Sequence, residues 1–427
     1  MAVYEQQFPR AVKPAPEPLG WYVRPSHIDH RGIADTLASG SIGLHGVIFD
    51  PLHEGRHAEL HDLVLEKDRD AILDPRTQEL GLPGGFNERL AKLPWAMDRQ
   101  HSPGDFDEVN ARRIADAIAQ YAISNRYTSV LAPTHYIESA NSPWLDVDVR
   151  STFYLRSYLD KAGGNKVPIF YSLAISYEAF RNKEERQVII QKLAGLPIQS
   201  LWVKVSQSGN LTHAGVRNLV TGAADFHSLG VPLIGDMAGG LRGLSALAFG
   251  AFGGVAHGVT QKESFNAGSW LKPPKPESKG FVLPPRVYVA PLDLHLKKQD
   301  AEAFFAARNA KSRFGCHDRG CCPRGPQDMF DNPIRHGLIQ RSAEIQRLSS
   351  VPEQYRAQRF LEDVLRPATD AAVFAETLSF GGHEKLERQM KEKRRVLDRL
   401  RIGLGKFVDD GHIVSFSQVP QRRAARR

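Results

Sequence analysis

Short apolar runs alternate with helical stretches from about Ser41 to Leu296. One intervening stretch places Ile114, Ile118 and Tyr121 on a single helical face. Alternation of this kind over roughly 250 residues favours a (β/α)8 TIM barrel. An open doubly wound sheet is the alternative, because strand order alone does not close a sheet. The eight predicted strands cover residues 44–49, 71–73, 128–131, 167–171, 201–205, 231–234, 254–256 and 286–289.

Proline-rich and basic segments indicate where the barrel region begins and where the chain continues into other regions. The first 25 residues contain five prolines, which predicts that residues 1–40 form an extended N-terminal arm. The barrel is then expected over residues 41–297. Residues 298–427 form a second region with helical patterns near 353–365 and 384–400, and they end in the basic tail 422–427.

Composition narrows the function classes. Of the 427 residues, 41% are hydrophobic and 24% are charged, which excludes a mostly disordered chain. The net charge of +8 permits a polyanionic partner such as nucleic acid. No membrane association is expected, because the most apolar stretch, 244–259, is short and interrupted by His257. The N-terminus has no apolar signal core, so we expect a cytoplasmic protein.

All three cysteines lie within seven residues. Cys316, Cys321 and Cys322 are followed by His336, and three thiolates with one imidazole suit a tetrahedral Zn²⁺ ion. We favour His336 over His317 as the fourth ligand, because a histidine on a helix can reach back to the cysteines. Four protein ligands leave no open position, so the zinc is expected to be structural. The alternative is three buried, inert thiols.

The cysteine segment and the helix that follows it, which reads IRHGLIQR from residue 334, resemble the tRNA-guanine transglycosylase superfamily. The likeness continues through Arg356 and Phe360, and it extends to the branch that inserts 7-deazaguanines into DNA. The resemblance implies a TIM barrel with a zinc subdomain after its last strand, and exchange of a base in nucleic acid for a 7-deazaguanine.

Two aspartates follow predicted strands, where barrel enzymes place catalytic groups. Asp74 follows the run 71–73, at the place where the resembled family carries a catalytic aspartate. The family's nucleophile region is matched here by GVAHGV at 254–259, which has no carboxylate, so Asp236 is the best substitute. Base exchange needs a carboxylate at the sugar carbon and a group that manages the proton of the departing base. A turn at Asp74 and a helix N-cap at Asp236 are the structural alternatives.

Further polar residues lie in the predicted mouth loops. They are expected to bind substrate: His135, Glu138 and Asn141 by reading a purine edge, and Tyr136 by stacking on a base. Lys204 lies inside the predicted strand 201–205 and Gln207 follows it; the Lys204 ammonium is expected to face a partner at the mouth, and it also fits a Schiff-base lysine. Glycines 239 and 240 would let a substrate approach the backbone, and His257 would border a phosphate site. The structural alternatives are a solvated polar loop for residues 135–141, a surface lysine for Lys204, and tight backbone packing for the glycines.

Two weaker patterns complete the candidates. Asp50, His53, Glu54 and His57 form a potential second metal or phosphate site, since His53 and His57 would share one face of a helix. The basic stretches 391–401 and 422–427 suit contacts with a phosphate backbone.

The sequence therefore predicts a base-exchanging glycosyltransferase that acts on nucleic acid, with DNA favoured over tRNA. Under this hypothesis the protein binds a 7-deazaguanine base and a structural Zn²⁺ ion. It is also expected to form a homodimer or to bind a partner protein. One alternative is a metabolic barrel lyase or aldolase that uses Lys204. Another is a non-catalytic, zinc-stabilised protein that binds nucleic acid.

Overall fold

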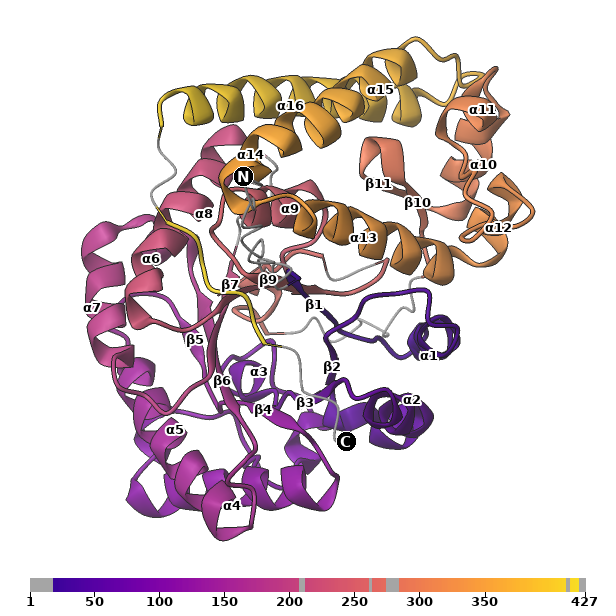
Figure 1. Ribbon diagram of the computed structural model, residues 1–427. Coiled ribbons are helices and arrows are strands. Elements are labelled where there is room, and N and C mark those ends of the chain that lie inside the picture. Colours follow the sequence, from indigo (N-terminus) through magenta and orange to yellow (C-terminus); the bar gives the residue numbers. More distant parts are fainter. Residues whose placement is uncertain (1–17, 207–211, 261–262, 274–283, 412–414, 422–427) are drawn as a thin grey trace, which may run out of the picture.

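A computed structural model describes residues 18–206, 212–260, 263–273, 284–411 and 415–421. Its centre is a closed parallel barrel, as the alternating pattern predicted (Figure 1). Closure rests on pairing of β1 with β9 and of β4 with β6. The eight barrel strands are β1 (Gly20–Val23), β2 (Gly46–Phe49), β3 (Asp70–Leu73), β4 (Ser129–Leu131), β6 (Ile169–Ile175), β7 (Ser200–Val205), β8 (Leu233–Asp236) and β9 (Gly254–His257).

The barrel interior is filled by side chains. One buried residue from each of the eight strands joins a single apolar cluster, and alternation along a strand sends its neighbours outward to the helices. The barrel interior is therefore a packed core without room for a ligand, so a binding or catalytic site must lie at one of its ends. The members of the interior cluster are Tyr22, Ile48, Ile72, Leu131, Phe170, Trp202, Ile234 and Ala256.

Helices surround the barrel, and a short strand, β5 (Tyr136–Ile137), adds to β6 above it. Asp107 caps α4 by accepting from the Asn110 amide. The helices of this part are α1 (His30–Ala38), α2 (Glu54–Glu66), α3 (Thr77–Leu80), α4 (Glu108–Ser124), α5 (Pro143–Lys161), α6 (Tyr177–Arg181), α7 (Lys183–Leu193), α8 (His213–Asp225) and α9 (Gly240–Ala248). Short 3₁₀ turns cover Pro51–His53, Leu90–Lys92, Pro103–Asp105, Phe226–Leu229 and Ala267–Ser269.

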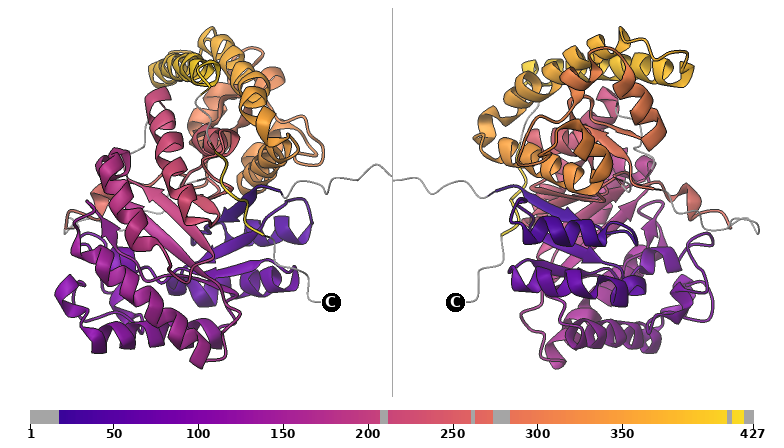
Figure 2. Two further views of the ribbon diagram at one scale, coloured as in Figure 1. Left: turned by 60° about the vertical axis from the view of Figure 1, so that its left-hand side comes forward. Right: turned by 90° about the vertical axis from the view of Figure 1, so that its right-hand side faces the viewer.

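The C-terminal subdomain packs on one side of the barrel, against α1, α8 and α9 (Figure 2). It contains a two-stranded antiparallel sheet and a group of helices. Its elements are β10 (Val287–Val289), a 3₁₀ turn (Ala290–Leu292), β11 (Leu294–Leu296), α10 (Lys298–Ala306), α11 (Ala310–Phe314), α12 (Pro326–Asp331), α13 (Pro333–Ser349), α14 (Glu353–Phe360), a π-helical turn (Leu361–Leu365), α15 (Arg366–Glu376) and α16 (Glu384–Asp409).

The structure differs from the sequence prediction at two strands. Gly20–Val23 lies in the expected N-terminal arm, yet it forms β1 and pairs with both β2 and β9. The run 286–289, expected as the eighth barrel strand, contains β10 and pairs with β11 outside the barrel. Prolines flank β1 in the sequence, but they lie outside its four residues and do not remove its ladder hydrogen bonds.

The end of the described chain returns to the barrel. The Ser417 amide donates to the Gly250 carbonyl at 2.8 Å, and the Leu233 amide donates to the Ser417 hydroxyl at 2.9 Å. Residues 415–421 therefore pack on the barrel and not within the helical subdomain where we expected them. The predicted basic tail, 422–427, lies outside the described residues. Among the described helices, none combines the length and the apolar character of a membrane span.

Candidate functional site

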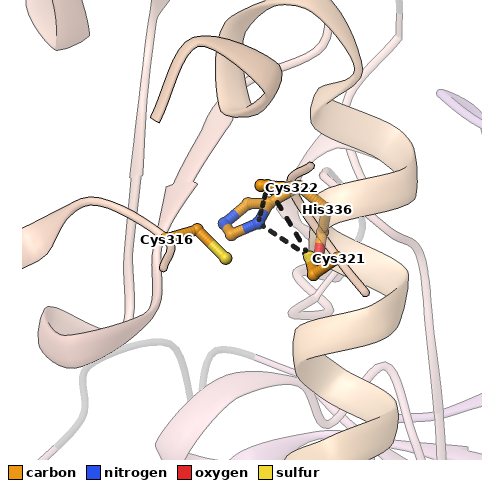
Figure 3. Close-up of side chains that lie close together, drawn as sticks. All are labelled: Cys316, Cys321, Cys322 and His336. Carbon is orange, nitrogen blue, oxygen red and sulfur yellow. Dashed lines mark hydrogen bonds between the residues drawn. The ribbon is translucent and has the colours of Figure 1, made fainter. Parts of the chain in front are cut away.

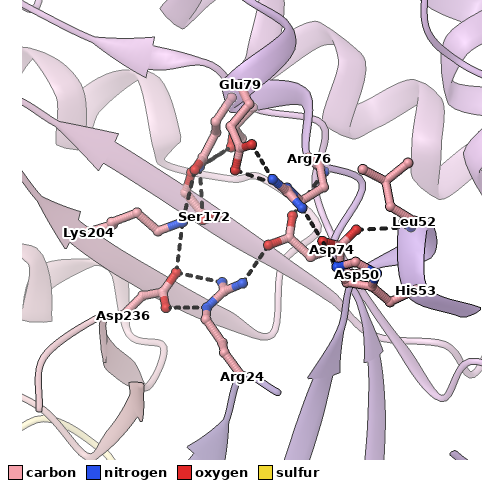
Figure 4. Close-up of polar contacts among 12 residues, drawn as sticks. Arg24, Asp50, Leu52, His53, Asp74, Arg76, Glu79, Ser172, Lys204 and Asp236 are labelled. Carbon is pink, nitrogen blue, oxygen red and sulfur yellow. Dashed lines mark hydrogen bonds and ion pairs between the residues drawn. The ribbon is translucent and has the colours of Figure 1, made fainter. Parts of the chain in front are cut away.

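Charged side chains converge at the carboxyl ends of the barrel strands (Figure 4). Asp50 and Asp74 directly follow β2 and β3, Asp236 ends β8, and Arg24 directly follows β1. Lys204 lies near the end of β7 and points to the same place. Because all barrel strands are parallel, residues at these positions meet at one mouth of the barrel.

Arg24 joins the two predicted catalytic aspartates. Its Nε and Nη2 donate to the two carboxylate oxygens of Asp236 at 2.8 and 2.7 Å, which is a bidentate ion pair. Its Nη1 donates to Asp74 Oδ2 at 2.5 Å. The two carboxylates therefore lie within the span of one guanidinium group, at opposite edges of it.

Lys204 completes the cationic side of this cluster. Its ammonium lies 3.2 Å from Asp236 Oδ2 and donates to the side-chain oxygen of Gln78 at 3.0 Å. Gln78 is itself fixed by donation to the Thr134 hydroxyl and to the Ser172 carbonyl. The lysine side chain is only 4% exposed, so its position is set by buried partners.

The cations hold the aspartates in the charged form. Burial raises the pKa of the Asp74 carboxyl, but the charges of Arg24, Lys204 and Arg76 outweigh burial and leave this pKa well below its usual value. The pKa of Asp236 is lowered in the same way, by Arg24 and Lys204 against burial. Both groups are carboxylates at neutral pH, which is the form required of a nucleophile or of a stabiliser of positive charge.

The backbone beside each aspartate is strained. Arg76, two residues after Asp74, has φ of 59°, and Met237, next to Asp236, has φ of 53°. Residues other than glycine rarely adopt this left-handed region, and such strain gathers at functional sites. Arg76 is held there by ion pairs with Asp50 and Glu79, and its amide donates to Asp74 Oδ1 at 3.0 Å.

A cavity of about 290 Å³ opens above this cluster. Its charged lining combines carboxylates and cations, and Phe265 and Trp270, whose ring centroids are 4.9 Å apart, form an aromatic part of the wall. Asp74 lines the cavity and its side chain is 15% exposed, whereas the Asp236 side chain is 0% exposed and lies behind Arg24. The residues lining the cavity are Arg24, Pro25, Ile48, Asp50, Asp74, Arg76, Glu79, Lys204, Met237, Ser264, Phe265, Asn266 and Trp270.

The loop after β4 lies away from this cavity. His135 is buried, bonded through Nδ1 to Asp148 at 2.7 Å and stacked on Trp144 at 3.7 Å. Burial lowers the pKa of His135 to about 3 and raises that of Asp148, so both groups favour the neutral form. Glu138 and Asn141 are exposed and do not line the cavity.

The other predicted substrate contacts occupy structural positions. Tyr136 is buried and packs edge-on against Phe265, so it supports the aromatic wall from behind. His257 is buried and its Nδ1 lies 2.6 Å from the Gly258 carbonyl, outside the cavity lining. Gly239 and Gly240 face two carboxylate side chains of the chain itself and not the cavity. Gln207 lies outside the described residues.

Several residues of the mouth were not predicted from the sequence. Arg24 was missed because its strand was assigned to the arm, although it directly follows the apolar run GWYV. Arg76 and Glu79 were missed because they lie beyond the strand end, Arg76 just before the short helix α3 and Glu79 within it. Phe265 and Trp270 come from the loop after β9, where no local pattern indicates that a side chain faces the mouth.

The side chains of the second metal or phosphate site predicted from the sequence, at Asp50, His53, Glu54 and His57, contact different partners in the structure. Asp50 pairs with Arg76, while His57 Nε2 lies 3.2 Å from the Ser26 carbonyl and its pKa is lowered by burial to about 4. Glu54 accepts a hydrogen bond from Tyr121. Among the described residues, the ligand atoms of these side chains do not form a group that fits one metal ion.

The three cysteines and His336 do form such a group (Figure 3). Their ligand atoms all lie within 4.8 Å of one another, and all four residues are buried. His336 Nδ1 lies 3.3 and 3.4 Å from the sulfurs of Cys321 and Cys322, which are 3.8 Å apart. Ligands of a tetrahedral Zn²⁺ ion are separated by roughly 3.5–3.8 Å, so the cluster is compatible with zinc.

The orientation of the His336 ring is fixed by its outer nitrogen. Nε2 lies 3.0 Å from the Tyr288 carbonyl, which can only accept, so Nε2 carries the proton and leaves Nδ1 free for a metal. His317 is exposed and its Nε2 contacts the Ser312 carbonyl instead. The structure therefore places His336, and not His317, with the three thiols.

Comparisons with known proteins identify no family. No family model matches the chain, and no curated protein matches it. Solved structures that resemble it include a GH18 chitinase from Pseudoalteromonas aurantia (9% identity, 56% of this chain and 92% of that chain, TM-score 0.37). Others are a GH26 β-mannanase from Bacteroides ovatus (12%, 60% and 86%, 0.36) and the carboxyl transferase domain of Rhizobium etli pyruvate carboxylase (10%, 92% and 61%, 0.34).

Proposed function

We propose that this chain is a base-exchanging glycosyltransferase that replaces guanine in nucleic acid with a 7-deazaguanine, with DNA preferred over tRNA. The observation that carries the proposal is the pair of ionised carboxylates, Asp74 and Asp236, on one guanidinium beside a cavity with an aromatic wall. The family resemblance of the cysteine segment and of α13 supplies the class of reaction.

Asp74 is the residue that we assign to the sugar carbon, because its carboxylate reaches the cavity and that of Asp236 does not. In the forward step an Asp74 oxygen forms a bond to C1′, the bond from C1′ to the base nitrogen breaks, and the base leaves with the bonding electrons. The ring nitrogen of the incoming base then attacks C1′ and releases the carboxylate, and the proton that this nitrogen loses is taken up by the anion of the departed base. Asp236 acts as a positioning residue that orients Arg24 and Lys204.

The remaining groups of the cavity suit a flat, polar heterocycle. Phe265 and Trp270 offer rings on which a flipped-out base stacks. Arg24 and Lys204 place positive charge beside the cavity, which stabilises the negative charge that builds on the departing base. The Cys3His cluster would hold Zn²⁺ as a closed, structural site that braces the C-terminal helices.

The test is nucleoside mass spectrometry on cells that express the protein and contain a 7-deazaguanine precursor. We expect a modified nucleoside in DNA with the wild type and none with Asp74→Asn. Glu138→Gln is the matched control, because this exposed carboxylate lies on a mouth loop outside the cavity. Modification of tRNA alone would reassign the substrate to tRNA. Unchanged DNA and tRNA despite expression would refute the proposal.

A barrel lyase or aldolase is the second candidate, because the Lys204 ammonium lines the cavity near the end of β7. Such an enzyme forms a Schiff base between Lys204 and a substrate carbonyl. Borohydride reduction in the presence of small phosphorylated aldehydes and ketones would then add mass to the peptide containing Lys204. A non-catalytic nucleic-acid-binding role is distinguished by an Asp74→Asn variant that keeps the full biological effect.

A further inference from the structure

A second buried charge cluster lies between the barrel and the C-terminal subdomain. Its centre is Arg341 on α13, whose side chain is 3% exposed. Its Nη2 donates to Asp293 at 2.7 Å and to Glu263 at 3.0 Å, and its Nη1 donates to Glu344 at 2.8 Å. Burial raises the pKa of Glu263 and of Asp293. The charge of Arg341, together with His295 at Glu263 and Lys393 at Asp293, outweighs burial and lowers both pKa values, so both groups remain carboxylates.

One side of this cluster contacts the predicted metal site. The guanidinium of Arg341 lies over the Tyr288 ring, 4.4 Å from its centre, and the Tyr288 hydroxyl donates to Glu344 at 2.9 Å. The backbone carbonyl of the same tyrosine fixes the His336 ring through Nε2. His336 and Arg341 are also on one helix, α13, so a metal that holds His336 holds the helix from which Arg341 extends.

The other side of the cluster holds the turn that follows Asp236. The Gly239 amide donates to the Glu263 carbonyl at 2.9 Å, and the Leu241 amide donates to Asp293 Oδ2 at 2.9 Å. A Cβ added at Gly239 would lie 2.6 Å from the Glu263 side chain. One added at Gly240, where φ is 62°, would lie 2.8 Å from Asp293. Glycine is therefore required at both positions so that the turn can pack closely against Glu263 and Asp293.

We propose that Arg341 is a positioning residue that couples the metal cluster to the turn 237–241 at the barrel mouth. The two carboxylates that Arg341 holds come from segments that each bond this turn, so loss of the guanidinium leaves them repelling each other next to it. Release of the metal frees His336 and, through α13 and Tyr288, loosens the same contact. The consequence for Asp236 as part of an active site rests on the proposed function; the coupling itself does not.

Hydrogen–deuterium exchange on the full-length, zinc-loaded protein tests the coupling without any substrate. We expect Arg341→Met to retain one zinc per chain while peptides covering 237–243 exchange about tenfold faster or more, since two backbone hydrogen bonds lose their fixed acceptors. Chelation of the wild type should accelerate exchange in the same peptides. Arg341→Lys, which keeps the charge, should restore part of the protection.

Two comparisons make the result specific. Arg347→Met alters an arginine on the same helix that makes no ion pair among the described residues, and it should leave 237–243 unchanged. Peptides from α4 and α5, away from the subdomain, should also exchange as in the wild type. Protection of 237–243 that persists in the chelated protein, or in a folded Arg341→Met variant, would overturn the coupling. Either result leaves the nucleoside test of function unaffected.

Discussion

Removal of the Arg24 side chain is the sharpest test of the charge cluster at the mouth. Arg24→Met replaces the guanidinium with an apolar chain and removes three charge-assisted hydrogen bonds, two to Asp236 and one to Asp74. Lys204 still contacts Asp236, and the Arg76 amide still donates to Asp74, so each carboxylate keeps one partner. Breaking a buried ion pair on one side costs about 3–5 kcal/mol, because a charge is left in a poorly solvated site.

This cost should depend on pH. The pKa values of both aspartates are lowered in the folded protein, so their ion pairs stabilise it fully above the ordinary carboxyl pKa, near about 4, and less as the pH falls through the folded values. Without Arg24, burial raises these pKa values, and the carboxyls take up protons as the pH is lowered. The gap in stability between wild type and variant should therefore be widest near neutral pH and narrow towards pH 4.

Thermal unfolding followed by intrinsic fluorescence measures the effect. A chain of this length unfolds with an entropy of roughly 0.9 kcal/mol/K, so the variant should lose about 3–6 °C in Tm at pH 7. Arg112→Met is the matched control, since its ion pair with Glu108 is exposed on α4, and its Tm should not change. An Arg24→Met protein with unaltered Tm at pH 7, or with a deficit that grows in acid, would refute the assignment.

Three further changes test other parts of the structure. Cys321→Ser should lower the zinc content from about one per chain towards zero by elemental analysis, because one of four ligands is lost, and a fully folded wild type purified without metal would contradict this. Gly253→Ala places a Cβ 1.9 Å from the Gln418 carbonyl, so limited proteolysis should release the C-terminal segment sooner; an unchanged cleavage rate would argue against its docking. His135→Ala leaves Asp148 without its buried imidazole partner and should lower Tm by about 1–3 °C while nucleoside modification persists; loss of modification by a folded variant would return His135 to the site.

The hydrophobic pattern alone predicted most of the barrel. Seven of the eight predicted strands lie in it, because buried parallel strands need continuous apolar runs and their connecting helices need one apolar face. Pattern could not identify β1, whose four residues lie among prolines, or exclude β10, whose run is as apolar as a barrel strand. A barrel closes when the first and last strands of the sheet pair with each other. The local sequence of a strand does not specify which strand it pairs with.

The sequence also predicted some features of the candidate sites, and the tertiary structure decided others. The sequence by itself indicated the three cysteines and a nearby histidine as a metal-binding group, since they lie within 21 residues and a short chain segment can bring them together; the structure decided for His336 over His317. It also placed Asp74 and Asp236 at strand ends. Only the tertiary structure decided that Arg24 joins these two aspartates, that His135 faces inward to Asp148, and that the glycines after Asp236 meet Glu263 and Asp293. Those contacts join residues far apart in the chain, and their energies arise from burial and charge that exist only once the barrel has closed.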